Sequence, residues 1–181
     1  MGKAIYLQTN RLVLMPITSK HITQNYVDWL NDPEVSKYLE ISSGQTLETL
    51  AAYIQEVEQK DIYFWGIHLK DSGKHIGNIK IDPVNTKNQY GEYGILMGDK
   101  SEWKKGYAKE ASICIIDFCF SVLHLRRITL GVIADNIAAV KLYENLGFEQ
   151  EGIYRKHGLY DGKYCDCLRM AIFNPSITYP E

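Results

Sequence analysis

Hydrophobic and polar positions follow two different periods in the first third of the chain. An aliphatic run over 11–15 predicts a strand that ends at a proline. A helix is expected over about 18–30, capped by Thr18 or Ser19, before an Asn-Asp-Pro break. A second helix starts at Thr46. Its apolar face is formed by residues at helical spacing, namely Leu47, Leu50, Ile54 and Val57.

Strand and helix patterns alternate in the rest of the chain. Aromatic and β-branched runs over 62–69 and 75–81, joined by a short turn, predict a hairpin, and 90–97 predicts a third strand. The stretch 106–123 is apolar on nearly all sides, as expected of a helix buried against a sheet. The remaining patterns predict a strand over 128–134, a helix over 136–146 that ends at Gly147, and strands over 148–154 and 167–173.

This order of elements predicts one domain over residues 1–181 with a mixed sheet. Three consecutive strands favour antiparallel pairing, whereas the strand–helix–strand unit across 106–123 requires a parallel pair. We expect about seven strands, mostly antiparallel, with about four helices on the two faces of the sheet. The fold class is therefore α/β in the broad sense, of the α+β type.

Composition and charge restrict the kind of partner. The 181 residues are 45% hydrophobic and 23% charged, which is typical of a globular domain with a full core. The formal charge of −2 gives no reason to expect a nucleic-acid or membrane partner. Neither the cysteines nor the histidines have metal-ligand spacing, so we expect no metal. No apolar run is long enough to cross a bilayer, and we expect a cytoplasmic protein with reduced cysteines.

The stretch 103–111, Trp-Lys-Lys-Gly-Tyr-Ala-Lys-Glu-Ala, contains the first candidate site. It follows a predicted strand and opens a predicted helix, where free backbone N–H groups and the helix dipole favour an anion. Gly106 and Ala108 are small enough for a pyrophosphate to approach closely. A bound anion would also explain three lysines at a helix start, where positive charge is normally unfavourable. An ordinary solvated loop before a helix explains the stretch equally well.

The second candidate lies on the next predicted helix. Asn136 and Tyr143 are two helical turns apart and therefore share one face. Taken alone, Asn136 is a helix cap and Tyr143 is a core aromatic residue. Glu92 lies on the strand before the glycine-containing turn and is a candidate general base. The alternative interpretation is an exposed strand glutamate without a catalytic role.

Together, these stretches resemble the GNAT superfamily of acyl-CoA N-acyltransferases. The family pattern is a strand, a pyrophosphate loop of the form Q/R-x-x-G-x-G/A, a helix, a strand and then N-x-x-A-x-x-x-Y-x-x-x-G-F. Trp103 stands where many members have Gln or Arg. This tryptophan, the opening Thr-Asn-Arg-Leu-Val-Leu at 9–14 and the closing Asp-Gly-Lys-Tyr-Cys-Asp at 161–166 resemble the branch of ribosomal-protein N-terminal acetyltransferases (RimJ/RimL type). The residues that match the two motifs are Gly106, Ala108, Asn136, Ala139, Tyr143, Gly147 and Phe148.

The resemblance implies a GNAT fold and acetyl-coenzyme A (acetyl-CoA) as cosubstrate. Backbone N–H groups around Leu96 and Met97 would pair with the pantetheine arm and polarise the thioester carbonyl. Asn136 would form a hydrogen bond with the cosubstrate. The pyrophosphate would bind to the backbone of the turn formed by Lys104, Lys105, Gly106, Tyr107 and Ala108.

The resemblance also implies the chemistry. The acetyl group would pass from acetyl-CoA to a primary amine by direct attack in a ternary complex, because no cysteine has an activating environment. Tyr143 would protonate the leaving thiolate, and Glu92 would accept the proton of the amine through a water. Water alone or a backbone carbonyl is the alternative proton acceptor. The alternative function is a non-catalytic acyl-CoA-binding sensor or structural module with a degenerate site.

The acceptor amine stays open at this point. A protein N-terminus, an amino sugar, a polyamine and an aminoglycoside all present an amine, and a homodimer is compatible with the resemblance. In this branch, the first two helices and the late loop form the acceptor site, and aromatic groups there suit a cationic amine or a sugar face. The residues that we expect to bind the acceptor are Trp29, Tyr38, His157 and Tyr160.

Overall fold

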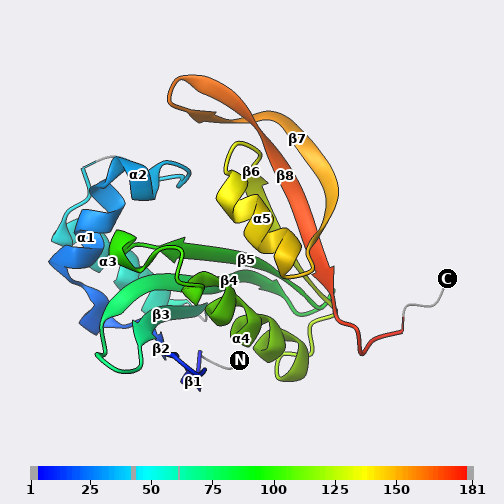
Figure 1. Ribbon diagram of the computed structural model, residues 1–181. Helices are drawn as coiled ribbons and strands as arrows, with labels where there is room; N and C mark the ends of the chain where they lie inside the picture. Colours follow the sequence, from blue (N-terminus) through cyan, green and yellow to red (C-terminus); the bar gives the residue numbers. More distant parts are fainter. Residues whose placement is uncertain (1–3, 42–43, 61, 179–181) are drawn as a thin grey trace. The chain divides into compact units, whose positions relative to one another are not determined.

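A computed structural model describes residues 4–41, 44–60 and 62–178, and Figure 1 labels its helices and strands. The chain divides into two compact units. The first unit comprises Met1–Asp82 and Gly94–Ala111, and the second comprises Pro83–Tyr93 and Ser112–Glu181. Three elements contribute residues to both units: β4 (His75–Asn85), β5 (Tyr90–Met97) and α4 (Tyr107–Ser121).

The first unit is built on strands that hydrogen-bond in the order β1-β2-β3-β4-β5. The pairs β1–β2, β2–β3 and β3–β4 are antiparallel, as the hairpin pattern predicts for β3 and β4. The other elements of this unit are β1 (Leu7–Gln8), β2 (Leu12–Pro16), a 3-10 helix (Ser19–His21), α1 (Gln24–Asn31), α2 (Pro33–Ser36), α3 (Leu47–Gln59), β3 (Tyr63–Leu69) and a second 3-10 helix (Lys100–Glu102).

Helices α1 and α3 share a hydrophobic cluster with the face of β3 that carries Phe64 (Figure 1). Leu50, Ile54 and Val57 of α3 are buried there, which confirms three of the four positions predicted from helical spacing. Leu47, the fourth, is exposed because it lies in the first turn of the helix. Each fully buried aliphatic side chain of this kind contributes roughly 1.5–3 kcal/mol to the stability of the fold.

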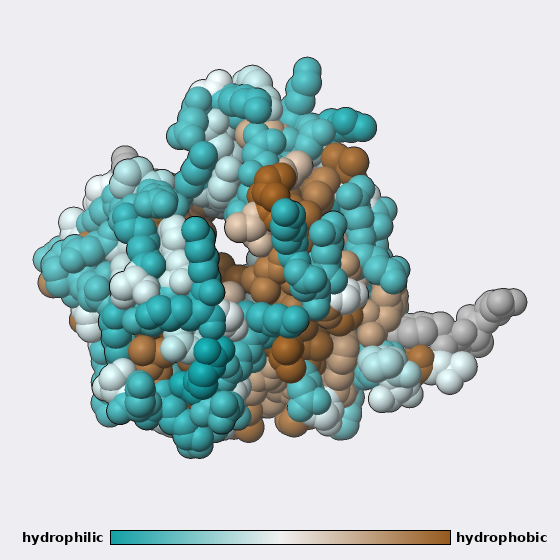
Figure 2. All heavy atoms as spheres, viewed as in Figure 1, coloured by the Kyte–Doolittle hydropathy of each residue, from teal (hydrophilic) through white to brown (hydrophobic). Residues whose placement is uncertain are grey.

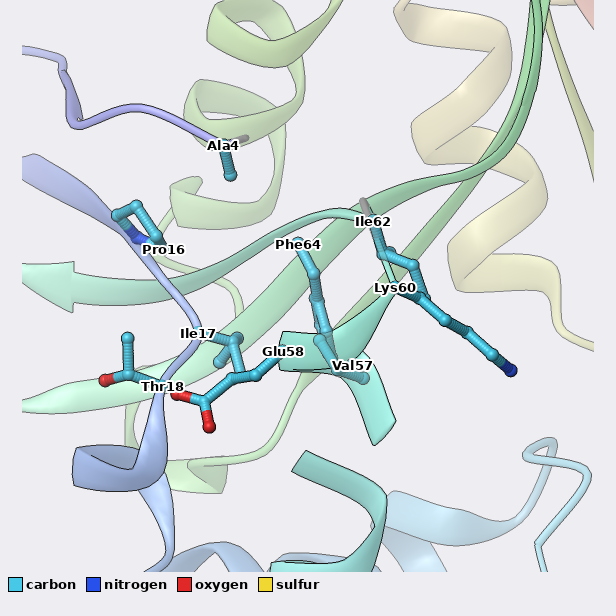
Figure 3. A pocket seen from close by; sticks show the side chains of 9 residues that line it. All are labelled: Ala4, Pro16, Ile17, Thr18, Val57, Glu58, Lys60, Ile62 and Phe64. Carbon is cyan, nitrogen blue, oxygen red and sulfur yellow. The ribbon is translucent and has the colours of Figure 1, made fainter. Parts of the chain in front are cut away.

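A pocket of about 300 Å³ lies at the edge of this cluster, where the end of β2 meets the end of α3 (Figure 3). Apolar side chains, including Ile17 and Val57, form most of its wall, and Glu58 and Lys60 are among the polar lining residues. None of the site residues that the sequence predicts lines this pocket.

The second unit continues the strand order as β4-β5-β6-β8-β7. Strands β5 and β6 pair in parallel, whereas β8 pairs antiparallel with both β6 and β7, so that β8 lies between them. The predicted mixed, mostly antiparallel sheet is therefore confirmed. The other elements of this unit are β6 (Arg127–Ile133), α5 (Ile137–Asn145), β7 (Glu149–Tyr160) and β8 (Lys163–Phe173).

The described residues form eight strands and five α-helices, one more of each than the pattern predicts. The extra strand, β1, has two residues, and the extra helix, α2, begins at Pro33 inside the expected break because Asp32 caps it. The single helix expected over 18–30 is instead a 3-10 turn followed by α1, which Thr23 caps. Strands β7 and β8 are longer than predicted and form one long hairpin (Figure 1).

The cysteines are reduced, and the surface is largely hydrophilic. All four cysteines are free thiols, and three of them are buried. Figure 2 shows a largely hydrophilic surface on which hydrophobic residues emerge over α4 and α5, where Ile113 and Ile137 are exposed. Within the described ranges, no helix has the length and apolar character needed to cross a membrane.

Three histidines of the first unit form a cluster beside Gly66. The Nε2 atoms of His21 and His68 are 3.2 Å apart, and the rings of His68 and His75 stack with centroids 4.7 Å apart. Gly66 leaves room for the cluster, because a Cβ at this position would lie 2.7 Å from His21 Nε2. Burial lowers the pKa of all three imidazoles, that of His75 to about 4, so the folded protein resists their protonation.

Stability is therefore expected to fall as the solution becomes acidic. The unfolded chain protonates His75 near its ordinary pKa of 6.5, whereas the folded chain does so near 4. The contribution of His75 is complete above pH 6.5 and is lost progressively as the pH falls toward 4, by about 3 kcal/mol in total. Urea unfolding of His75→Gln should show a shallower pH dependence between these values than the wild type. Equal slopes would contradict this assignment, and His124→Asn, at an exposed position, is the control.

Candidate active site

The turn between β5 and α4 has the backbone shape of an anion-binding loop. Lys104 and Gly106 have positive φ angles of 62° and 83°, and Lys105 between them does not. Alternation of this kind turns successive N–H groups into a shared concavity. The helix that follows begins at Tyr107, and its first N–H groups have no partner within the helix. Only glycine adopts the Gly106 conformation without strain, whereas at Lys104 it costs roughly 1–2 kcal/mol.

The lysines of this turn are not all available to a ligand. Lys105 Nζ lies 2.8 Å from Glu102 Oε2, and the same carboxylate accepts from Lys74 Nζ at 3.2 Å. Glu102 is only 8% exposed, so a protein carboxylate compensates part of the positive charge that the sequence places here. Lys104 and Lys109 are exposed. Of the three lysines, Lys104 and Lys109 are therefore the two that are exposed and available to an anion.

The end of β5 presents backbone groups on its edge away from β4. The N–H groups of Gly98 and Asp99 donate to Ile76 O on β4, at 3.0 and 3.1 Å. A Cβ on Gly77 of β4 would lie 2.3 Å from Leu96 O, so the Leu96 carbonyl faces β4. We expect the Met97 N–H on the opposite edge. Trp103 Nε1 donates to Met97 O at 2.8 Å and so connects the start of the turn to this point.

Trp29, which we expected to bind the acceptor, lies in the core of the first unit. It is 5% exposed, and its indole packs on Gly98, where a Cβ would lie 2.0 Å from Trp29 Cδ2. The ring of His75 lies 4.9 Å from it. The Trp29 ring therefore packs against the backbone just after the end of β5. Tyr38, which lies just beyond α2, is half-buried, and Lys37 Nζ lies 5.3 Å from its ring.

In the second unit, Tyr143 of α5 packs in an aromatic cluster. Its ring lies 5.8 Å from that of Tyr93 and 5.9 Å from that of Phe148. The side chain is 7% exposed, and burial raises the pKa of its phenol to about 12. In the described part of the chain, the Tyr143 hydroxyl has no hydrogen-bond partner, whereas the Tyr93 hydroxyl lies 2.6 Å from Ser112 Oγ. Tyr143 thus combines an anchored ring with an unused donor.

Asn136 caps the helix that carries Tyr143. Its Oδ1 accepts from Ala139 N at 3.3 Å, which is the structural role that the sequence allows for it. This contact uses the carbonyl side of the amide and leaves the Nδ2 donors for another partner. The cap therefore does not compete with the predicted hydrogen bond to the cosubstrate.

Glu92 is held by two partners of the same unit. Arg169 Nη1 and Nη2 each donate to one carboxylate oxygen at 2.8 Å, and Thr129 Oγ1 donates to Oε2 at 2.9 Å. Burial alone would raise the pKa of Glu92, but these hydrogen bonds and the Arg169 charge outweigh it, so the pKa lies below its ordinary value. Gly131 leaves room for the pair, since a Cβ there would lie 2.8 Å from Arg169 Nη1. One acceptor position on Oε1 stays open for a water.

The other two expected acceptor residues lie on β7. His157 is exposed, and its ring is 5.2 Å from that of Tyr154. Tyr160 is half-buried, and its ring covers Gly158, where a Cβ would lie 2.3 Å from Tyr160 Cε2. In the ranges that the structure describes, no three His, Cys, Asp or Glu side chains are grouped to hold a metal ion.

Sequence reasoning missed several residues that contact the candidate site. Arg169 and Thr129 hold Glu92, and Arg11 and Glu110 contact the turn before α4. Arg11 and Glu110 stand in the stretches that carry the family resemblance, which was the available signal. Arg169 and Thr129 lie on strands without a motif, so nothing in the spacing singles them out.

Comparison with known proteins shows the family to which the chain belongs. Residues 11–149 match the acetyltransferase (GNAT) domain family. An uncharacterised N-acetyltransferase of Bacillus subtilis is 29% identical over 173 residues, which cover 93% of this chain and 97% of that protein.

Two solved structures are similar over nearly their whole length. Spermidine N-acetyltransferase from Vibrio cholerae, in complex with CoA and spermine, superposes with a TM-score of 0.82 at 22% identity, covering 92% of this chain and 97% of that one. Ribosomal-protein-S5-alanine acetyltransferase from Vibrio fischeri superposes with a TM-score of 0.83 at 19% identity, covering 95% and 98%. At these identities the likeness shows the fold alone.

Proposed function

Because the chain belongs to the acetyltransferase (GNAT) domain family, we propose that it transfers the acetyl group of acetyl-CoA directly to the nitrogen of a primary amine. The family uses acetyl-CoA, and the N-acetyltransferases among its relatives support the reaction type. A ternary complex is favoured over an acyl-enzyme, because Cys119, Cys165 and Cys167 are buried and burial also raises the pKa of the Cys114 thiol.

The Tyr143 hydroxyl is the observation that carries this proposal. The neutral amine attacks the thioester carbonyl, a tetrahedral oxyanion forms, and its collapse expels the CoA thiolate, which needs a proton. A phenol with a pKa of about 12 is protonated throughout the neutral range, and its hydroxyl is not engaged elsewhere in the described chain. Tyr143 therefore supplies a hydrogen-bond donor to the developing thiolate in every turnover.

We assign the cosubstrate contacts to backbone groups. The N–H groups of the Lys104–Ala108 turn bind the pyrophosphate, helped by the dipole of α4. The Met97 N–H polarises the thioester carbonyl and stabilises the oxyanion. Met97 is favoured over Leu96 for this role, because the Leu96 carbonyl faces β4 and the N–H and C=O of one strand residue share an edge. Asn136 Nδ2 contributes a further hydrogen bond to the cosubstrate.

For the acceptor we propose a molecule with a single ammonium group, either a small molecule or a peptide N-terminus. A polyamine needs several free carboxylates, and two acidic residues of the segment that leads to Tyr38 are already paired. Lys100 Nζ lies 2.6 Å from Asp32 Oδ2 and 3.2 Å from Glu34 Oε2. The aromatic face of Tyr38 suits a cation or a sugar ring, and so does that of Tyr160.

An acceptor screen tests this proposal. Thiol release from acetyl-CoA should be fastest with a monoamine, among an amino acid, an amino sugar and a short peptide, and slower with spermidine. A preference for spermidine would overturn the acceptor assignment and leave the acetyl transfer itself standing. The RimJ/RimL-type branch, the homodimer and the cytoplasmic location stay predictions.

Glu92 is expected to relay the proton of the amine through a water on Oε1. Glu92→Gln should lower kcat about tenfold or more at neutral pH, and the loss should shrink at high pH, where the amine arrives already neutral. A pH–rate profile of the variant is the measurement. A raised KM with unchanged kcat at every pH would instead assign Glu92 to attraction of the substrate.

The control for this variant is Glu151→Gln. Glu151 forms an ion pair with Arg127 in the same unit, and it lies outside the predicted site. Its substitution removes a comparable carboxylate and should leave the pH–rate profile unchanged.

A further inference from the structure

We propose that Arg11 is a positioning residue that holds the anion-binding turn before α4 in its binding conformation, an inference that rests on the proposed function. Arg11 lies at the start of the chain, immediately before β2, whereas the turn lies about ninety residues later. Both belong to the first unit. Their contacts form one connected group, in which Glu110 is the central acceptor.

Glu110 joins the start of the chain to the first turns of α4. Its Oε1 accepts from Thr9 Oγ1 at 2.6 Å and from Arg11 N at 2.8 Å, and its Oε2 accepts from Arg11 Nε at 2.7 Å. The bond from Nε anchors the Arg11 side chain, and the bonds from Thr9 Oγ1 and Arg11 N anchor its backbone to the same carboxylate. Burial alone would raise the pKa of Glu110, but these bonds outweigh it and keep the carboxylate ionised.

The guanidinium of Arg11 then reaches the turn itself. Its Nη1 donates to Lys105 O at 3.0 Å, and its centre lies 4.4 Å from the centroid of the Tyr107 ring. A Cβ on Gly106 would lie 3.5 Å from Arg11 Nη2, so the guanidinium packs directly against the turn. Arg11 therefore touches the three consecutive residues that connect the loop to the helix.

The contact with Lys105 O determines where the next N–H points. In a planar trans peptide, the C=O of Lys105 and the N–H of Gly106 point in opposite directions. Holding this carbonyl on Arg11 directs the Gly106 N–H away from Arg11, toward the side on which the anion binds. It also keeps the carbonyl oxygen, which would repel a phosphate, out of the concavity.

Arg11 acts through the turn because its own charge is matched. Glu110 neutralises it, so Arg11 contributes little net attraction for an anion. A lysine at this position keeps the charge but lacks the planar fork that bonds Glu110 with Nε and Lys105 O with Nη1 in one fixed geometry. Arg11→Lys thus separates the geometry of the fork from its charge.

The test compares two cosubstrates that differ at the pyrophosphate. Arg11→Lys should raise the Kd for CoA, measured by calorimetry, about tenfold, as expected for the loss of one charge-assisted contact. It should also raise the KM for acetyl-CoA, whereas the KM for S-acetylpantetheine, which has no phosphate, and kcat should not change. Arg11→Gln should show the same selectivity with a larger effect.

Three outcomes separate the possibilities. Unchanged CoA affinity in both variants would overturn the role of Arg11, and so would an equal loss for acetyl-CoA and S-acetylpantetheine, which would indicate a general structural effect. Failure of the wild type to bind CoA would overturn the proposed function together with this inference. Arg155→Lys, which alters an exposed ion pair with Asp166, is the matched control and should leave both cosubstrates unaffected.

Discussion

Tyr143→Phe is expected to lower kcat by about 100-fold or more while the Kd for acetyl-CoA stays nearly unchanged. The substitution keeps the ring, which packs against Tyr93 and Phe148, and removes only the hydroxyl. Since that hydroxyl has no partner in the described chain, its loss leaves no buried group unsatisfied. Stability should therefore change little, and the effect should fall on departure of the thiolate.

The chain offers a closely matched control in Tyr93→Phe. Tyr93 belongs to the same aromatic cluster, but its hydroxyl is already paired with Ser112 Oγ at 2.6 Å. Removing it should lower the free energy of unfolding by about 1 kcal/mol and leave kcat nearly unchanged. Equal kcat values for wild type and Tyr143→Phe, measured with the best acceptor, would return Tyr143 to a purely structural role.

Gly106→Val is expected to weaken CoA binding by at least about tenfold. A β-branched residue is strongly disfavoured at the φ of 83° that Gly106 adopts, so the turn must change shape and its N–H groups lose their arrangement. A Cβ at this position would lie 3.5 Å from Arg11 Nη2, so the larger side chain also crowds the guanidinium that packs on the turn. Calorimetry with CoA on the folded variant is the measurement.

Gly73→Val is the control that separates the effect of backbone strain on stability from the loss of the CoA site. Gly73 has a similar φ of 69° in the turn between β3 and β4, and a Cβ there meets nothing within 4 Å. The two variants should lose a similar amount of stability, roughly 1–2 kcal/mol, but only Gly106→Val should lose CoA affinity. If both variants bind CoA like the wild type, the turn is not the pyrophosphate site.

Much of the fold is predictable because its signals are local. The spacing of Leu50, Ile54 and Val57 identifies the buried face of α3, and Asn136 marks the start of α5. Helix α2 escaped prediction because Pro33 acts there as a first helical residue and not as a breaker. The long β7–β8 hairpin escaped because exposed polar and apolar residues are mixed along both strands, so alternation is weak.

The candidate site also has a part that local sequence signals predict and a part that they do not. The turn around Gly106 and the helix with Tyr143 are contiguous motifs, so sequence reasoning finds them. The partners of Glu92 and Lys105 are set by strand pairing and by contacts between distant segments, which no spacing reveals. Trp29, in contrast, was singled out from the sequence as an acceptor residue, and the structure places its ring in the core against Gly98.

Direct acetyl transfer to an amine is the central claim, and product analysis tests it most directly. The wild-type protein is incubated with acetyl-CoA and the best amine of the screen, and the products are quantified by mass spectrometry and thiol titration. We predict equal amounts of free CoA and of amine acetylated on nitrogen, with no acetyl group retained on the protein. Binding of acetyl-CoA without an acetylated product from any primary amine would contradict the account and indicate an acyl-CoA-binding sensor.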